Sequence, residues 1–314
     1  MAITWKLQGG TVASATAVAD LGLSNLVRTR RSLSRDELTF DCSGAAVDSA
    51  ALFAYGDAVT LTRDVDGTPT KWFVGVCIEV PRLAAGRAED LRYVIAGTWW
   101  YFENLVYQQN WPIVGTPASR RAFIVAGLSP SGNVRENTKE FVEEVLDWLI
   151  GSGGGAVTQY TSGDLPAGFE VPFMRLEAPT CAEALQYIAR WMPDAASSFD
   201  YTTTPPTFNL KRRAAASTAS YALTALAEVQ LVPRNELKLD RLVIQYVTIG
   251  SGGSIALAEE VDPVGTTGRE FGCAVVTLDN NYLPLAAGLA ANYRAGLSTL
   301  QYSGRIVVEE DECA

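Results

Sequence analysis

The stretch that decides the fold is residues 53–80, which read FAYGDAVTLTRDVDGTPTKWFVGVCIEV. In its first half Val59 and Leu61 alternate with threonines, the period of two that is typical of a half-buried strand. Residues 66–67, an Asp-Gly pair, favour a turn. In the second half five large apolar residues share one parity and predict a strongly apolar strand face: Trp72, Val74, Val76, Ile78 and Val80. The stretch therefore predicts a β-hairpin that needs other strands to cover its apolar face.

Outward from this hairpin, residues 1–105 have the pattern of a small all-β domain. Apolar and polar residues alternate around residues 5–7, 38–42 and 91–95, with turn residues between these runs. The small, Ala-rich residues 11–25 are compatible with either strand or loop. About six short strands separated by turns predict a closed or nearly closed β-barrel.

The next part of the chain, residues 106–213, mixes helix and strand. Residues 137–140 and 180–183 have the spacing of capping boxes, and each precedes apolar residues at helical spacing. Residues 198–201 and 207–210 then read as two strands joined by a Thr-rich turn. This order of elements predicts an α+β domain.

Residues 214–314 return to a β pattern. A strand is expected over residues 237–247, with a partner over 255–260, and Pro284 is expected to begin a helix. The final apolar run, residues 306–308, needs a pairing neighbour, yet little sequence follows it. We therefore expect that the natural chain continues past Ala314, or that another subunit completes this sheet.

The composition excludes several classes of protein. Of 314 residues, 48% are hydrophobic and 19% are charged, which argues against disorder. The formal net charge of −10 does not suit specific binding of nucleic acid. No run of 18 apolar residues and no signal peptide is present, so we expect no membrane span and synthesis in a cytoplasm.

Candidate catalytic residues are few. Histidine is absent, which excludes Ser/His/Asp and Cys/His arrangements. Glu143 and Glu144 are expected on the solvent side of a helix, and the acidic run 309–312 at the end of a strand. Neighbouring carboxylates of this kind do not provide the two different environments that acid/base catalysis needs. The sequence therefore predicts no catalytic, cofactor-binding or metal site and no enzyme.

The cysteines are scattered along the chain without a Cys-x-x-Cys spacing. This argues against a disulfide framework or a local zinc site and favours buried free thiols. The five are Cys42, Cys77, Cys181, Cys273 and Cys313.

An aromatic cluster separates the first β region from the α+β region. It consists of residues 99–102, Trp-Trp-Tyr-Phe, with Trp111 a short distance beyond. Such rings can form a platform that stacks bases or sugars, or they can fill a junction between domains. Because the chain is acidic, we favour the junction.

The layout resembles a known family, the baseplate-hub or tail-tip hub proteins of tailed bacteriophages and the related hub part of type VI secretion spikes. Residues 55–61 and 72–80 look like the paired strands of the first hub barrel, and residues 90–97 resemble the strand that follows. Residues 180–189 and 199–210 are similar to the domain inserted between the two hub barrels.

The resemblance implies a mainly β fold with an α+β insertion, in which two small antiparallel β-barrels flank an α+β domain. The domains would be 1–105, 106–213 and 214–314. This chain departs from the family in one respect, because the pattern of residues 214–314 predicts fewer strands than a complete second barrel needs. Three copies would place six barrels in a ring, as a homotrimer that joins a six-fold tail tube to a three-fold tip in the virion. An acidic channel would let DNA slide through during ejection without adhering.

The resemblance also implies partners and one cofactor. The partners are the tail tube or distal tail protein above, a spike, fibre or tip protein below, and the tape-measure protein. Some tail-tip proteins of long-tailed phages carry an iron–sulfur cluster, for which Cys273 and Cys313 are the candidates here, although their spacing gives no support.

Two rival functions belong to other classes. One is a tail-associated carbohydrate- or receptor-binding protein that uses the aromatic platform of Trp99, Trp100, Tyr101 and Trp111. The other is a peptidoglycan-cleaving tail enzyme, for which the sequence offers no acid or nucleophile. Exposed aromatic rings would favour the binding protein, and buried rings would favour the hub.

Overall fold

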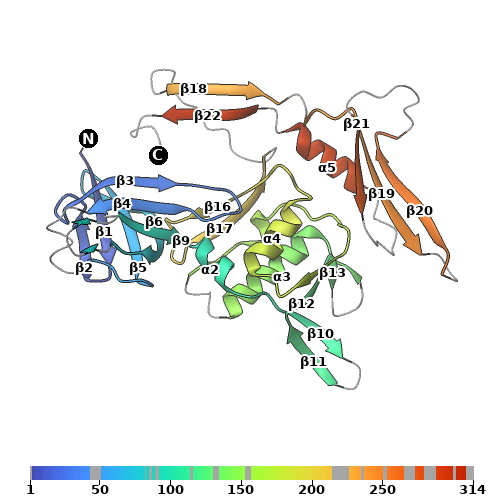
Figure 1. Ribbon diagram of the computed structural model, residues 1–314, viewed down its shortest axis with the longest axis horizontal. Coiled ribbons are helices and arrows are strands. Elements are labelled where there is room, and N and C mark those ends of the chain that lie inside the picture. The colour runs from blue at the N-terminus through green and yellow to red at the C-terminus, as the bar shows by residue number, and fades with distance from the viewer. Residues whose placement is uncertain are drawn as a thin grey trace.

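The N-terminal strands form a sheet at one end of the molecule, the strands after residue 240 lie at the other end, and helices of the middle of the chain lie between them (Figure 1). The computed structural model describes residues 2–42, 51–81, 83–84, 87–88, 92–113, 116–129, 134–152, 157–213, 226–234, 237–249, 253–264, 273–278, 288–299 and 302–308.

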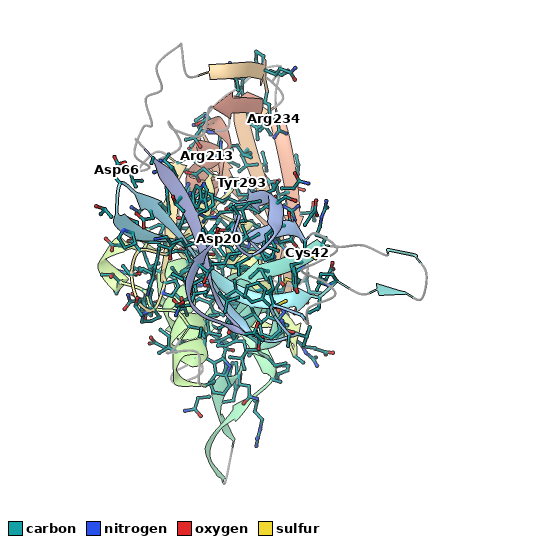
Figure 2. The ribbon with its side chains drawn as sticks, turned by 90° about the vertical axis from the view of Figure 1, so that its left-hand side faces the viewer. Asp20, Cys42, Asp66, Arg213, Arg234 and Tyr293 are labelled. Carbon is teal, nitrogen blue, oxygen red and sulfur yellow. The ribbon has the colours of Figure 1, made fainter. Side chains whose placement is uncertain are left out.

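The N-terminal sheet has seven strands, and every pairing in it is antiparallel. The strand order is β2-β1-β5-β6-β9-β4-β3. The bounds are β1 Ile3–Gly9, β2 Val12–Ala17, β3 Leu23–Thr29, β4 Glu37–Cys42, β5 Ala58–Val65, β6 Thr68–Glu79 and β9 Arg92–Gly97; two short strands, β7 Leu83–Ala84 and β8 Arg87–Ala88, form a separate pair. The sheet curls around wholly buried side chains that include Leu7, Phe40, Leu61, Phe73 and Ile95. Figure 2 shows this sheet toward the viewer, with Cys42 and Asp66 on opposite sides of it.

The predicted hairpin is confirmed, because β5 and β6 pair in antiparallel register with Asp66 and Gly67 at the turn. The predicted core face of β6 is wrong. Phe73 and Cys77 are completely buried, whereas Trp72 is only half-buried. Alternate side chains of a curled sheet point to its inside and outside, and four of the five large residues of the other parity are only half-buried: Trp72, Val74, Ile78 and Val80. Of these five, Val76 is nearly fully buried as well.

The middle of the chain contains the predicted helices and hairpin. Both capping boxes are present, at Asn137 before α3 (Thr138–Gly151) and at Thr180 before α4 (Cys181–Ala189). The predicted two-stranded unit is β16 (Ala195–Asp200) paired with β17 (Thr207–Arg212). The other elements here are α2 Trp99–Asn104, β10 Gln109–Ile113, β11 Thr116–Arg121, β12 Phe123–Ala126, β13 Leu128–Ser129, β14 Val134–Arg135, the 3₁₀ turn Ser162–Asp164 and β15 Met174–Glu177.

The last third contains two separate groups of strands. β18 (Leu226–Pro233) pairs with β22 (Tyr302–Val308), and β19 (Arg241–Ile249) lies between β20 (Ile255–Asp262) and β21 (Cys273–Leu278), next to α5 (Leu289–Ser298). The expectation that the final strand finds no partner within this chain is wrong, because β18 supplies it. The predicted helix start at Pro284 lies outside the described residues. The described strands after residue 226 form a ribbon and a three-stranded sheet, and the second barrel stays a prediction.

The N-terminal sheet is joined to the middle of the chain through a buried arginine. The side chain of Arg28 is 5% exposed and its Nη2 lies 3.3 Å from Oδ2 of Asp36. Nη1 donates to the carbonyl of Trp72 at 2.7 Å, and the guanidinium lies 4.6 Å from the centre of the Trp72 ring and 5.0 Å from that of Tyr201. The Tyr201 hydroxyl, from the turn after β16, donates to the same Asp36 oxygen at 3.4 Å. The two parts therefore share one desolvated polar cluster.

Polar contacts beside this cluster extend the junction. The backbone N–H of Leu33 donates to Oγ of Ser197 at 2.6 Å, and the N–H of Ser197 donates to Oγ of Ser32 at 2.9 Å. Nε2 of Gln186 on α4 donates to the carbonyl of Leu33 at 2.9 Å. The loop between β3 and β4 is thus fixed against both β16 and α4.

Candidate assembly surface

One face of the sheet of β19, β20 and β21 packs against the rest of the molecule, as far as the described residues show. Leu242 and Ile244 of β19 are completely buried, and Tyr246 is 6% exposed. Helix α5 packs against β19 and β20 with Leu289 and Ala290 buried. This face is the inner one, and it belongs to the core of the molecule.

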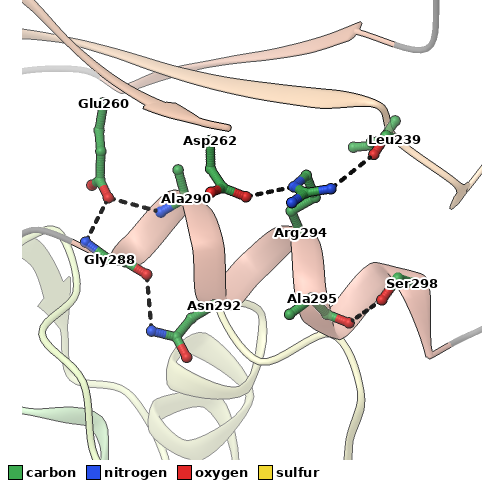
Figure 3. Close-up of polar contacts among 9 residues, drawn as sticks. All are labelled: Leu239, Glu260, Asp262, Gly288, Ala290, Asn292, Arg294, Ala295 and Ser298. Carbon is green, nitrogen blue, oxygen red and sulfur yellow. Dashed lines mark hydrogen bonds and ion pairs between the residues drawn. The ribbon is translucent and has the colours of Figure 1, made fainter. Parts of the chain in front are cut away.

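Charged groups fix α5 to β20 (Figure 3). Oε1 of Glu260 accepts hydrogen bonds from the backbone N–H groups of Gly288 and Ala290, at 2.8 and 3.1 Å. A carboxylate here satisfies N–H groups that have no partner in the helix and complements the helix dipole. Further along the helix, Nε of Arg294 lies 2.5 Å from Oδ2 of Asp262. The helix is therefore anchored at its N-terminus and near its middle.

The opposite face of the same sheet carries exposed apolar side chains. Strand pairing places Ile249 opposite Ile255 and Val247 opposite Leu257, so these four residues share one face. Ile249 is 43% exposed, Ile255 76% and Leu257 69%. We call these four residues the apolar end of the sheet. Figure 1 shows the joined ends of β19 and β20 projecting from the rest of the molecule.

The apolar end is large enough to contribute to association. The exposed parts of its side chains amount to about two whole aliphatic side chains, and burying each contributes about 1.5–3 kcal/mol. Covering this end would therefore contribute about 3–6 kcal/mol for each copy of the chain. Polar residues border the apolar end on the side toward the body of the sheet. Gln245 donates a hydrogen bond to Glu259 at 2.7 Å, and Thr277 lies beside Gln245 on the next strand. An apolar centre with a polar border is typical of protein interfaces.

The ribbon of β18 and β22 adds exposed backbone to this region. Neither strand pairs with a third strand within the described residues. Leu231 and Val232 of β18 are 49% and 62% exposed. Isolated two-stranded ribbons are marginally stable in water, and open edges accept further strands. The ribbon is therefore a second place where another chain could pair.

The aromatic cluster is mostly internal. Trp99 and Phe102 of α2 are completely buried and stack on each other, with ring centres 5.0 Å apart. Trp100 and Tyr101 are half-buried, and Nε1 of the half-buried Trp111 donates to a backbone carbonyl at 2.8 Å. Trp99 is thus unable to contribute to a stacking platform, and its burial favours the interpretation as a domain junction.

Glu143 and Glu144 lie on the polar side of α3, where they are half-buried and line a cavity that is open at the surface. One oxygen of Glu144 accepts a hydrogen bond from the Tyr107 hydroxyl at 3.0 Å. Glu136, which has no local sequence signal, is 3% exposed and lines the same cavity. Burial, together with the negative charges of Glu144 and Glu140, raises the pKa of Glu136 to about 8. The acidic run 309–312 lies outside the described residues.

The cysteines fall into two sets. Cys42, Cys77 and Cys181 are buried free thiols, as predicted. Cys273 lies in β21 and Cys313 lies outside the described residues, so the iron–sulfur hypothesis stays a prediction. No group of three Asp, Glu or Cys side chains in the described ranges is arranged to hold a metal ion. None of the helices described has the length and apolar character to span a bilayer.

Comparisons with known proteins gave matches among solved structures. No family model matches the sequence, and no curated protein matches it. The chain is similar to the 43 kDa tail protein of prophage MuSo2 from Shewanella oneidensis, with 13% identity over 95% of this chain and 80% of that one and a TM-score of 0.49. It is also similar to the prophage tail protein gp18 from Listeria monocytogenes, with 8% identity, coverage of 92% and 76% and a TM-score of 0.46.

A third similar structure is a chain of the Francisella PdpA–VgrG complex, with 7% identity and a TM-score of 0.45. The match covers 88% of this chain and 40% of that one. The names of the first two proteins are those of tail proteins, the class that the sequence resembles.

Proposed function

We propose that this chain is a structural protein of a phage tail. Three copies form a homotrimeric hub that joins the six-fold tail tube to the three-fold tip and lines the DNA channel. The chain has no catalytic role of its own in this proposal. It is assembled in the host cytoplasm and becomes part of the virion.

The observation that carries the proposal is the apolar end of the β19–β20–β21 sheet. Exposed isoleucine and leucine side chains at the joined ends of two strands are costly in water, and self-association is the usual way to cover such a surface. The ribbon of β18 and β22 lies in the same third of the chain and offers open strand edges for the same contact.

Two further features support a role as a scaffold. The junction around Arg28 and Asp36 fixes the N-terminal sheet to the middle of the chain, as a protein that connects two parts of a tail requires. The net charge of −10 suits a channel that DNA passes without binding. The proposed partners are the tail tube or distal tail protein on one side, a spike, fibre or tip protein on the other, and the tape-measure protein.

The test is the mass of the particle in solution, measured by light scattering after size exclusion. We expect about 101 kDa, three times the 33.7 kDa of one chain. Leu257→Glu places a charge in the apolar end and should give the mass of one chain, whereas Met174→Glu, at a 38% exposed position on β15, should leave the trimer intact. A wild-type chain that remains a monomer at micromolar concentration, or two variants that behave alike, would contradict the proposal.

A further inference from the structure

A cavity of about 220 Å³ lies between α3 and the chain segment that leads into β10. Residues 107–110 line one side of it, and Glu144, Asp147 and Trp148 of α3 line the other. It adjoins the acidic cavity beside Glu136, with which it shares Glu144 and Asp147. Its volume is below the range of about 300–1,000 Å³ that is typical of sites for drug-sized ligands, so it suits a ligand with a single ring.

The side formed by residues 107–110 is held in place by the surrounding chain. The N–H of Tyr107 donates to the carbonyl of Pro179 at 2.8 Å, and its hydroxyl donates to Oε2 of Glu144 at 3.0 Å. Gln109 is 1% exposed, and its Oε1 accepts from the N–H of Val125 at 2.9 Å. Tyr107 and Gln109 therefore keep their positions before a ligand arrives, which lowers the entropic cost of binding.

The opposite side combines an indole ring with a carboxylate. Nε1 of the half-buried Trp148 donates to the carbonyl of Val106 at 2.9 Å, and this bond fixes the orientation of the ring. Asp147 is exposed, and its Oδ1 accepts from the Tyr160 hydroxyl at 2.7 Å. A carboxylate has about four acceptor positions, so Asp147 can accept further hydrogen bonds. Asn110, across the cavity, is exposed as well.

The chemistry of these groups decides which ligand fits. The amides of Gln108, Gln109 and Asn110 donate and accept hydrogen bonds, whereas the carboxylates of Glu144 and Asp147 only accept them. A matching ligand must therefore offer donors as well as acceptors, and a hydroxyl group offers both. A sugar ring carries several neighbouring hydroxyls, and its C–H face can pack on an aromatic ring such as the Trp148 indole.

Other classes of ligand match the cavity less well. Among the described residues that line it there is no lysine or arginine, and a phosphate or carboxylate would meet two groups of like charge. A metal ion needs several ligands around one point, and the described ranges hold no such group of acidic or Cys side chains. An apolar ligand would displace water from the amides and carboxylates without replacing its hydrogen bonds.

We propose that this cavity binds one neutral pyranose ring of a glycan. Asp147 and Asn110 form hydrogen bonds with its hydroxyls, and Trp148 packs against its C–H face. The inference goes beyond the hub proposal and does not depend on it, because a single chain supplies the whole lining. Figure 1 shows the β10–β11 hairpin on the side of the molecule opposite the β18–β22 ribbon, so strand pairing at that ribbon leaves the cavity accessible.

The experiment is ¹⁹F NMR of the chain with 5-fluorotryptophan in place of its seven tryptophans. Trp148→Phe assigns the signal of Trp148, and Trp111→Phe assigns that of Trp111, which does not line the cavity. The probes are the methyl glycosides of glucose, galactose, mannose and N-acetylglucosamine. At least one should shift the Trp148 signal in a saturable way, with a Kd in the millimolar range that is expected for so small a ligand, and leave the Trp111 signal in place.

Asp147→Asn keeps the shape of the side chain and removes its charged acceptor, so it should lower the affinity about tenfold. Asp20→Asn is the matched control, because it makes the same change at an exposed position in the turn between β2 and β3. It should leave the affinity unchanged.

Three results would overturn the proposal. The first is a Trp148 signal that none of the four glycosides shifts in a saturable way. The second is an equal loss of affinity in the two Asp variants, which would show an effect of net charge alone. The third is tighter binding of methyl glucosaminide, whose amino group is charged at mildly acidic pH, than of its N-acetylated form, which would show attraction of a cation by the carboxylates.

Discussion

Replacing Arg28 by Met tests the junction between the N-terminal sheet and the middle of the chain. The substitution keeps an unbranched side chain against the Trp72 ring but removes the cation beside Asp36. Among the described residues, Asp36, whose side chain is 7% exposed, would then keep as donors the Tyr201 hydroxyl and the N–H of Arg31, at 3.4 and 3.1 Å. The loss of stability should therefore be that of an uncompensated buried carboxylate.

The size of the effect follows from the burial of both partners. Removing one member of a buried ion pair costs about 3–5 kcal/mol, and the lost cation–π contacts belong to the same cluster. With an m-value of about 3 kcal/mol/M, a loss of about 4 kcal/mol lowers the urea midpoint by about 1.3 M. Changing Asp36→Asn in the same chain removes the unpaired charge, so the double variant should recover at least half of the loss.

The measurement is urea unfolding followed by far-UV circular dichroism. Arg92→Met is the matched control, because its ion pair with Asp41, at 2.9 Å, is 51% and 27% exposed and should contribute less than about 1 kcal/mol. The reasoning fails if Arg28→Met shifts the midpoint no more than Arg92→Met does, or if the double variant is as unstable as the single one.

Three further predictions concern other parts of the chain. Gly75→Ala would place a methyl carbon 2.2 Å from a carbonyl oxygen of β9 and should lower the free energy of unfolding in urea by about 3 kcal/mol or more. Gly151 has open space around it, so Gly151→Ala should change that free energy by less than about 1 kcal/mol. Equal effects of the two substitutions would contradict this prediction. Burial raises the pKa of Cys181 to about 12, so a thiol reagent at pH 8 should label it only as fast as the chain unfolds, and rapid labelling of the native protein would be inconsistent with this burial. Because the pKa of Glu136 is raised, the folded state holds a proton that the unfolded chain releases, and the free energy of unfolding should fall as pH rises from about 4.5 to 8. Glu136→Gln should flatten this pH dependence by up to about 1.4 kcal/mol per pH unit. The same slope in both proteins would refute the prediction.

The parts of the fold that were predictable from the sequence are those with local causes. The turn at Asp66 and Gly67 lies between two runs of alternating residues. The strands that these runs form, β5 and β6, follow each other in the chain and pair with each other in the sheet. The capping boxes at Asn137 and Thr180 each join residues three apart in the sequence. Their hydrogen bonds therefore depend on the first turn of the helix and not on distant parts of the chain. Local signals of this kind survive any tertiary arrangement.

The parts that were not predictable depend on distant residues. The buried face of β6 is set by the curl of a seven-stranded sheet, which brings Gly75 against β9 and Phe73 inside. The partner of β22 lies about seventy residues earlier, so its pairing leaves no pattern in the final residues. Glu136 precedes the cap of α3 and acquires its buried position only when Tyr107 and Glu144 approach it, and no spacing in the sequence indicates this.

The β16–β17 hairpin has a mechanical consequence. Near its turn, Tyr201 is bonded to Asp36, and at its other end Arg212 lies 2.5 Å from Oδ1 of Asp194 and donates to the carbonyl of Asn292 on α5 at 3.4 Å. Strands of six residues span about 20 Å, and a paired hairpin resists bending more than a loop does. The hairpin therefore connects the first sheet to α5 through paired strands, and we expect a displacement of that sheet to carry α5 with it.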